Sequence, residues 1–281
     1  NAVTFMDRVV RGDLSFVKKN SDTGEALAYI PFRITNNTTG ETHYILTDAN
    51  GNFTSATGKT TNTNANDDVL SKYGEKDVVP QSVIDSLAKD AGLWFGMGSE
   101  GTMTAANDSY GAFVYGTYTI TELKTEATRS MKMYTNTFTI DTDGKVLDLG
   151  TVNNVPMEIK TTLVDVNGEH FIEAASTVTL TDHVAYKNLD TDKTYTLTGT
   201  LYVKDGDALT ELMTETVDFQ PTETSGTQDV TFTFDASELV GKSVVAFEEL
   251  SVNGEFCAEH KDKDDENQTV TFPGIQTTAR D

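Results

Sequence analysis

The stretch TYTLTGTLYV, residues 194–203, indicates what kind of fold this chain adopts. Apolar or aromatic residues alternate in it with threonine or glycine, which is the period of a strand with one face buried and the other in water. β-Branched and aromatic side chains also fit a pleated sheet well. The same pattern recurs in TYTITELKT (117–125), TNTFTIDTD (135–143) and STVTLTD (176–182). The sequence therefore predicts an all-β protein.

Length, charge and cysteine content narrow the classes of function. A chain of 281 residues with 37 % hydrophobic content can bury more than one core, so two domains are expected. Lys and Arg total 21 against 44 Asp and Glu, and the net charge of −23 argues against binding to nucleic acid or to an anionic membrane. The single cysteine, Cys257, excludes an intramolecular disulfide, the usual covalent staple of an extracellular β protein.

The first predicted domain, residues 1–156, is a β domain interrupted by an insertion at about 55–100. Within the insertion, residues 80–92 combine Pro at a first helical turn, apolar residues at helical spacing and Gly92 as a stop signal. A short helix is therefore expected there. Strand patterns resume after the insertion and end at Pro156, which we interpret as the boundary between domains.

The second predicted domain, residues 157–275, restarts with EIKTTLVD and ends with QTVTF. The closing PGIQTTARD repeats the pattern of MEIKTTLVD, so residues 276–281 are expected to begin a further repeat or a tail. No apolar stretch is long enough to span a membrane, and the opening NAVTFMDR lacks the pattern of a signal peptide. We expect an internal fragment, with any export signal and anchor in other parts of the parent chain.

Lys18 and Glu122 are the first candidate site. Glu122 alternates with Tyr118 and Ile120 in one strand pattern, so these three side chains are predicted to share a face. A buried lysine or glutamate is costly unless it loses its charge or finds a partner. From the residues alone, a buried Lys–Glu pair and two surface side chains with buried stems both remain open.

Three motifs surround Lys18 and Glu122, separated by a long insertion: DLSFVKKNSDTGEALAYIPFRI (13–34), YGTYTITE (115–122) and TVNNVP (151–156). Together they resemble the motifs of collagen-adhesin B-type (prealbumin-like) domains of Gram-positive surface proteins and pilins. It implies an isopeptide bond from Lys18 to Asn154, with Glu122 as its catalyst. Lys19 and Asn153 are the neighbouring alternatives. Burial suits this chemistry because it favours a neutral amine that can attack and a protonated carboxyl that can polarise the amide.

Residues 158–272 contain, in this order, the motifs TTLVD (161–165), TLTDHVAY (179–186), VVAFEEL (244–250) and EHKDKDDENQTV (259–270). In these motifs and their order the segment resembles the T-VaFE repeat domains, and among them the clostridial adhesin domains with an intramolecular Thr–Gln ester bond. The resemblance implies that Thr161 is the nucleophile and Gln268 the acyl donor. His260 would be the base, and Asp182 and Glu248 a supporting acid pair that shares a proton.

The same residues also allow different interpretations. Thr161 is equally consistent with an ordinary strand residue, and His260 with a solvated loop residue. A hydrolase built on Thr161, His260 and Glu248 is a competing enzyme class, and it would need an open substrate pocket. A ligand-binding adhesin module, contacting a host protein or glycan through the insertion, is a third class. The acidic loop 262–266 could hold a cation but lacks the ligand spacing of a known calcium loop.

The expectation as a whole is two immunoglobulin-like β-sandwich domains in tandem, the first with a short helical insertion. They would form part of the stalk of a Gram-positive surface adhesin or pilus-like protein, and each would carry a self-formed cross-link. We expect no cofactor, no metal and no catalytic turnover beyond the bond-forming event itself. The expected partners are neighbouring repeat domains of the same chain, which is expected to be monomeric, extracellular and anchored to the cell wall.

Overall fold

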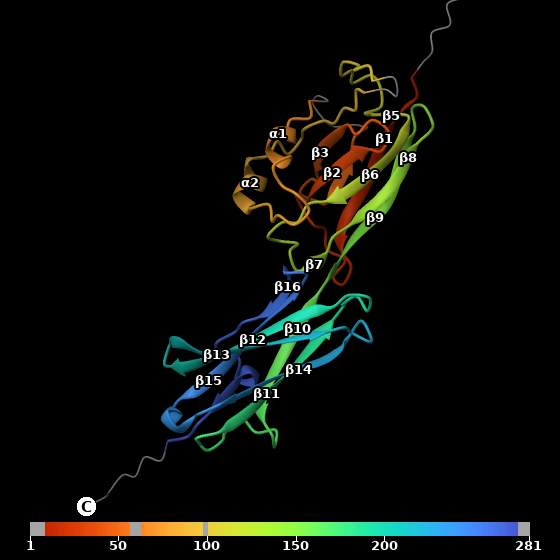
Figure 1. The fold of residues 1–281 in the computed structure, drawn as a ribbon. Helices are drawn as coiled ribbons and strands as arrows, with labels where there is room; N and C mark the ends of the chain where they lie inside the picture. Colours follow the sequence, from red (N-terminus) through yellow and green to blue (C-terminus); the bar gives the residue numbers. More distant parts are fainter. Residues whose placement is uncertain (1–8, 57–62, 98–100, 275–281) are drawn as a thin grey trace, which may run out of the picture. The chain divides into compact units, whose positions relative to one another are not determined.

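The computed structural model describes residues 9–56, 63–97 and 101–274 (Figure 1). The chain divides into two compact units, Asn1–Pro156 and Met157–Asp281. Within these described ranges each unit holds two β-sheets, so the predicted all-β fold class is confirmed. The predicted further repeat or tail at 276–281 lies outside the described residues, as do parts of the insertion.

The first unit has nine strands among its described residues. They are β1 (Arg11–Asn20), β2 (Pro31–Asn36), β3 (Thr42–Leu46), β4 (Asn52–Thr54), β5 (Phe113–Val114), β6 (Gly116–Glu122), β7 (Met131–Lys132), β8 (Thr135–Ile140) and β9 (Val146–Pro156). One sheet has the order β4-β1-β9-β7, with β5 also on β1, and the other has the order β3-β2-β6-β8. β1 and β9 pair in parallel, so the first and last strands of this unit are neighbours.

Alternation along the strands builds the core of the first unit. In β6, Tyr118, Ile120 and Glu122 point inward, while the threonines between them lie on the outer face. Tyr118 packs in an aromatic cluster with Phe95, Phe113 and Phe138, at ring-centroid distances between 5.0 and 5.6 Å. Glu122 therefore enters the same interior as these rings, and this places the first site.

The insertion forms a small separate core against β3. Helix α1 (Asp67–Leu70) and helix α2 (Gln81–Ser86) lie beside this strand in Figure 1. The buried residues of this core are Leu46, Leu70, Val79, Ile84, Leu87 and Leu123. The insertion is thus attached to the sandwich by apolar packing of its own.

The helix predicted over residues 80–92 is shorter in the structure. α2 has Pro80 as its N-cap, and the backbone at Leu87 is already extended. Leu87 remains buried in the small core, and the ammonium group of Lys89 donates a hydrogen bond to the carbonyl of Ile84. This side chain satisfies a terminal carbonyl that a longer helix would have bonded internally, so the helix ends before Gly92.

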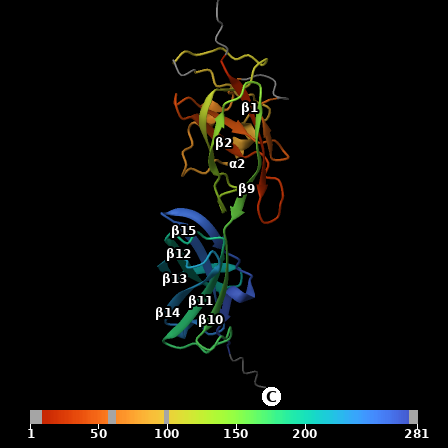
Figure 2. The ribbon, with the colours of Figure 1, turned by 90° about the vertical axis from the view of Figure 1, so that its right-hand side faces the viewer.

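The second unit has eight strands among its described residues. They are β10 (Glu158–Asp165), β11 (Val178–Lys187), β12 (Tyr195–Asp205), β13 (Ala208–Phe219), β14 (Gly226–Phe234), β15 (Ser243–Val252), β16 (Glu255–His260) and β17 (Thr269–Thr271), with the short helices η1 (Ser237–Leu239) and η2 (Glu266–Gln268). One sheet has the order β10-β11-β14, and the other has the order β13-β12-β15-β16 with β17 also on β15. Figure 2 shows β10 and β11 beside each other.

The sheets of the second unit enclose one large apolar core. β12 takes up nearly all of the stretch 194–203, and its Tyr195, Leu197 and Leu201 are buried as the alternation predicts. In β10 the inward positions include Thr161, between the buried Ile159 and Leu163. A polar side chain, that of the predicted nucleophile, therefore lies in an apolar row. In the described part of the chain, no helix is long and apolar enough to cross a membrane.

Candidate functional site

The structure brings Lys18, Glu122 and Asn154 together in the interior of the first unit. Lys18 comes from β1, Asn154 from β9 and Glu122 from β6 in the opposite sheet. Nζ of Lys18 lies 2.5 Å from Oδ1 of Asn154 and 2.9 Å from Oε2 of Glu122. The other carboxyl oxygen, Oε1, accepts a hydrogen bond of 2.7 Å from Nδ2 of Asn154. One oxygen of Glu122 thus faces each of the two side-chain nitrogens.

The surroundings of this cluster favour uncharged forms. Lys18 and Asn154 are fully buried, and Glu122 is 2 % exposed. Burial lowers the pKa of Lys18, although the nearby carboxylate of Glu122 acts in the opposite direction. Burial likewise raises the pKa of Glu122, against the opposing effect of Lys18. Both shifts act toward a neutral amine beside a protonated carboxylic acid.

The neighbouring alternatives lie elsewhere. Asn153 is exposed and Lys19 is half-buried, because each is one position out of phase with the inward face of its strand. Sequence reasoning missed Tyr134, whose N–H donates a hydrogen bond of 3.2 Å to Oε2 of Glu122. Its ring centroid is 5.3 Å from Nζ of Lys18. No pattern in the sequence marked this residue.

In the second unit, Thr161 lies beside His260. Oγ1 of Thr161, a side chain that is 4 % exposed, is 3.4 Å from Nδ1 of His260. The other ring nitrogen, Nε2, faces Oδ2 of Asp265 at 3.6 Å. With the ring proton on Nε2, facing this carboxylate, Nδ1 is free to accept the hydroxyl proton. Sequence reasoning noted Asp265 only as part of the acidic loop, since nothing distinguished it from the other acids there.

Gln268 is the last residue of η2 and is fully buried. Its Nε2 donates to the carbonyl oxygens of Ala246, at 2.8 Å, and His260, at 3.1 Å. Its Oε1 accepts a hydrogen bond of 3.2 Å from the backbone N–H of Asp262. β10, which carries Thr161, packs against η2. The predicted nucleophile and the predicted acyl donor therefore come from the first strand of the unit and from the residue just before its last strand.

Asp182 and Glu248 are both fully buried in the interior of the second unit. Asp182 lies on β11, opposite Leu163 of β10, and Glu248 lies on β15, directly opposite His260. None of their four carboxyl oxygens has a hydrogen-bond partner of good geometry. A supporting acid would be expected to donate to the Gln268 amide, but Gln268 is held by backbone groups instead.

Burial shifts the acid–base properties of this pair strongly. It raises the pKa of Asp182 to about 6, although Glu248 and the Thr161 hydroxyl favour the charged form. It raises the pKa of Glu248 to about 10, and the charge of Asp182 adds to that shift. Two carboxyl groups in one apolar site cannot both ionise, so the pair carries at most one negative charge near neutral pH.

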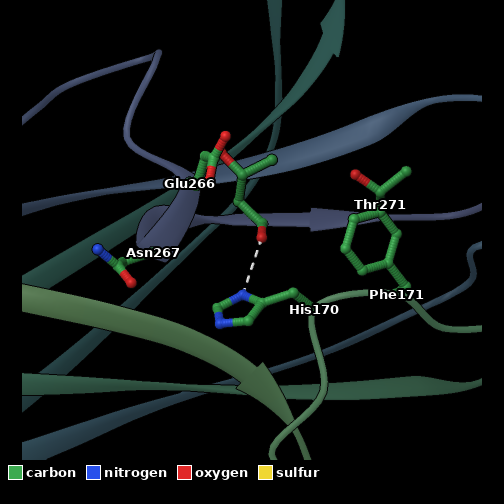
Figure 3. A pocket seen from close by; sticks show the side chains of 6 residues that line it. His170, Phe171, Glu266, Asn267 and Thr271 are labelled. Atoms are coloured by element: carbon green, nitrogen blue, oxygen red, sulfur yellow. Dashed lines mark hydrogen bonds between the residues drawn. The ribbon is translucent and has the colours of Figure 1, made fainter.

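A cavity of about 360 Å³ opens beside η2 (Figure 3). It is lined by His170, Phe171, Glu266, Asn267, Thr269 and Thr271, and Nδ1 of His170 lies 3.1 Å from the carbonyl oxygen of Thr269. Thr161, His260 and Glu248 are not among the lining residues. The cavity therefore does not supply the substrate pocket that a hydrolase built on these three residues would need.

The acidic loop 262–266 uses its carboxylates internally. Oδ1 of Asp262 accepts from the N–H of Asp264 at 3.0 Å, and Oδ1 of Asp265 accepts from the N–H of Asn267 at 2.9 Å. Asp264 also contacts the ammonium groups of Lys204 and Lys263. Among the residues that the structure describes, no group of three or more His, Cys, Asp or Glu is arranged to hold a metal ion.

Residues 157–272 match the family described as T-Q ester bond containing domain. The match covers β10 through β17, and with them Thr161, His260 and Gln268. The second unit is similar to T-Q ester bond domains over nearly its whole length. The predicted resemblance to ester-bond repeat domains is thereby confirmed for this half of the molecule. A comparison of the whole chain with curated proteins gave no match.

Several solved structures align with the chain at low identity. A bacterial adhesin from Mobiluncus mulieris, containing intramolecular disulfide, isopeptide and ester bond cross-links, aligns over 42 % of this chain and 57 % of its own, with 16 % identity and a TM-score of 0.38. The full-length major pilin SpaD from Corynebacterium diphtheriae aligns over 96 % of this chain and 65 % of its own, with 12 % identity and a TM-score of 0.46. BcpA, the major pilin subunit of Bacillus cereus, aligns over 89 % and 67 %, with 12 % identity and a TM-score of 0.42. The chain spans less than two thirds of the length of the adhesin and of SpaD.

Proposed function

We propose that the chain is a load-bearing stalk segment of a bacterial surface adhesin or pilus-like protein, and that each of its two domains closes with a self-formed covalent cross-link. The observation that carries the proposal is the arrangement of both clusters. Each pairs a nucleophile with a side-chain amide, and each pair joins the first strand of a domain to the last strand or the residue before it.

In the first domain the bond is an isopeptide between Lys18 and Asn154. The neutral amine of Lys18 attacks Cγ of Asn154, Oε2 of Glu122 takes a proton from Nζ, and Oε1 delivers a proton to Nδ2. Ammonia leaves, and Glu122 ends with the proton count it began with. The proposal is supported by the contacts of Glu122, because one oxygen lies within hydrogen-bond distance of each nitrogen.

In the second domain the bond is an ester between Thr161 and Gln268. His260 takes the hydroxyl proton at Nδ1, Oγ1 of Thr161 attacks Cδ of Gln268, and the proton passes from His260 to Nε2 of Gln268 so that ammonia departs. Asp265 holds the ring orientation. Glu248 lies directly opposite His260, and the single negative charge of the acid pair, which the lower pKa places on Asp182, favours the imidazolium that forms in between.

Burial accounts for a reaction that occurs once and stops. A hydrolase would follow acylation with attack by water, whereas Thr161 is almost fully covered and Gln268 is fully covered. With water excluded, the ester persists as a product rather than an intermediate. We therefore propose single-turnover chemistry without further catalysis, for both bonds.

The positions of the two bonds determine how the chain would carry tension. Force that enters the first domain through β1 passes from Lys18 directly to Asn154 in the parallel neighbour β9. Force in the second domain passes from β10 through Thr161 to Gln268 and into β17. The intervening chain of each domain is bypassed, so neither sandwich needs to resist unfolding through hydrogen bonds alone.

We further propose an extracellular, cell-wall-associated location, with neighbouring repeat domains or subunits as partners. A stalk that is exposed to shear and proteases benefits from covalent closure, and this chain has no second cysteine for a disulfide. For the alternative, a ligand-binding adhesin module that contacts its ligand through the insertion, the described residues of the insertion offer no comparable support.

Single-molecule stretching between the two ends of the chain tests the proposal. The wild-type chain should extend only by the segments outside Lys18–Asn154 and Thr161–Gln268, at any force below bond rupture. The Asn154→Ala/Thr161→Val double variant should instead show two full unfolding steps. Two full unfolding steps in the wild type would refute the load-bearing role.

A further inference from the structure

The orientation of the Gln268 amide is determined by its three hydrogen-bond partners. Two of them, the carbonyl oxygens of Ala246 and His260, can only accept, so they require the NH₂ group. The third, the backbone N–H of Asp262, can only donate, so it requires Oε1. Turning the amide over would set two carbonyls against an oxygen and one N–H against an NH₂ group. The carbonyl oxygen of the reacting amide is thereby fixed on the N–H of Asp262.

We infer that the backbone N–H of Asp262 is the oxyanion donor of the ester-forming reaction. The inference rests on the proposed ester between Thr161 and Gln268, and it assigns a catalytic role within that site. When Oγ1 of Thr161 bonds to Cδ of Gln268, the carbonyl π electrons move onto Oε1. The charge that develops there is stabilised by a donor that already lies 3.2 Å away.

The step balances without any outside reagent. The Thr161 oxygen gains a bond to Cδ, and its proton goes to Nδ1 of His260. The oxyanion on Oε1 then collapses, the bond from Cδ to Nε2 breaks, and the proton on His260 passes to the departing nitrogen as ammonia. Before the reaction, Nε2 is held by the backbone carbonyls of Ala246 and His260.

The donor is held in place by the loop that surrounds it. Oδ1 of Asp262 accepts from the N–H of Asp264, and the carbonyl of Asp262 accepts from the N–H of Asp265 at 3.3 Å. The carbonyl of Asp265 in turn accepts from the N–H of Gln268 at 3.1 Å. Donor and acyl group thus belong to one hydrogen-bonded turn, so little reorganisation is needed when charge develops.

The acid pair does not compete for this role. No carboxyl oxygen of Asp182 or Glu248 makes a hydrogen bond of good geometry to any group, and the partners of Gln268 are all backbone atoms. The pair is therefore placed to influence His260 and Thr161, while Asp262 stabilises the acyl oxygen. The two functions lie on different elements of the domain, β11 and β15 for the acids and the 262–268 turn for the donor.

The test replaces this single N–H with oxygen in the full-length chain. Cys257, the only cysteine, allows a recombinant thioester ending at residue 256 to be ligated to a synthetic segment that begins at Cys257. One segment carries the natural Asp262, and the other carries its α-hydroxy acid, which keeps the side chain and removes the N–H. Neither ligated chain is cross-linked in the second domain before refolding. Loss of ammonia there is followed by intact mass from the moment of refolding.

The chain with the natural segment should form the ester between Thr161 and Gln268. The chain with the α-hydroxy acid should form it about 10²–10³-fold more slowly, which is the usual effect of removing one oxyanion donor. Equal rates for two folded chains would overturn the inference while leaving the ester itself intact. Failure of the natural chain to lose ammonia in this domain would instead overturn the ester. Circular dichroism and thermal unfolding of both chains, measured beside Thr161→Val, show whether each has folded.

Recombinant variants give a second, independent comparison. Asp262→Pro removes the N–H, and Asp262→Asn keeps both the N–H and the side-chain acceptor of the turn. Asp262→Asn should be purified fully linked, and Asp262→Pro largely unlinked but as stable as Thr161→Val. A fully linked Asp262→Pro would contradict the inference.

Discussion

Nζ of Lys18 lies 2.5 Å from Oδ1 of Asn154, although the two residues are 136 positions apart in the chain. The contact joins two parallel strands, β1 and β9, which begin and end the first domain. An unlinked pair in this position would be an ordinary buried hydrogen bond. A linked pair would close nearly the whole domain into a covalent loop.

Asn154→Ala is expected to destabilise the first domain through loss of this loop. By analogy with a disulfide that closes a loop of similar length, the free energy of unfolding should fall by about 4–5 kcal/mol. At roughly 2–4 °C for each kcal/mol in a domain of this size, Tm should fall by about 8–20 °C. Asn154→Ala is preferred to Lys18→Ala because it leaves the contact between Lys18 and Glu122 in place. Asn153→Ala, one position away and exposed, is the matched control and should leave Tm unchanged.

Substitutions at Thr161 separate the hydroxyl from the shape of the side chain. Thr161→Ser keeps the nucleophile and should still lose the ammonia of the second domain, whereas Thr161→Val keeps the shape and should not. Thr162→Val, on the exposed face of the same strand, is the control and should link normally. Hydroxylamine should cleave the link in Thr161→Ser and leave the isopeptide of the first domain intact. An ammonia loss that survives Thr161→Val would show that another residue is the nucleophile.

The acid pair predicts how the stability of an unlinked second domain depends on pH. The pKa values of Asp182 and Glu248 rise from 3.8 and 4.5 to about 6 and about 10, so the folded domain holds more protons than the unfolded chain between these limits. The extra protons bound by the folded domain add to its free energy of unfolding. This contribution is fully present below about pH 4, and it is lost as pH rises through the pKa values of the folded state. For Thr161→Val, the free energy of unfolding should therefore fall with rising pH, by up to about 1.4 kcal/mol per unit for one proton. Urea titrations at a series of pH values measure this slope.

The matched control for that experiment is Glu248→Gln in the same Thr161→Val background. This substitution removes the carboxyl group with the larger pKa shift, so the free energy of unfolding should change less with pH above about pH 6. Any pH dependence that comes from the chain's net charge of −23 remains in both proteins. Identical slopes in the two proteins would mean that Glu248 titrates normally and is not held protonated by burial.

Gly199 is expected to position the acid pair. It lies directly opposite Glu248 across β12 and β15, and a Cβ there would collide with Oε1 of Glu248 and lie 2.7 Å from Cζ of Phe232. Gly199→Ala should displace the carboxyl group and slow ester formation by on the order of 10²-fold, as small misplacements of reacting groups do. It should also cost about 1–3 kcal/mol through overpacking. Thr198→Ala, whose side chain points outward, should link at the wild-type rate, and a linked, fully stable Gly199→Ala would refute the positioning role.

The sequence allowed much of this arrangement to be predicted, because strand alternation is local. The inward position of Glu122 follows from its place two residues after Ile120, and that of Thr161 from its place two residues before Leu163. The partnership of these residues with others far along the chain came from motif resemblance. Neither the alternation nor the composition of the strands predicts which distant residues come together.

Other features could not be predicted because they depend on the path of the backbone. Asp265 is one of several acids in a loop, and only the turn from Asp262 to Gln268 sets it against His260. The N–H of Asp262 carries no side-chain signal at all. The helix at 81–86 is shorter than its pattern because Leu87 packs into the small core and the Lys89 side chain bonds the carbonyl of Ile84 at the end of the helix.

The intact mass of the purified, denatured chain is the decisive test of the two cross-links, since each of them expels one ammonia. We predict that the wild-type chain lacks two ammonias, that Asn154→Ala and Thr161→Val each lack one, and that the double variant lacks none. A wild-type chain with its full unmodified mass would contradict both cross-links, and the two clusters would then be buried polar groups without a covalent bond.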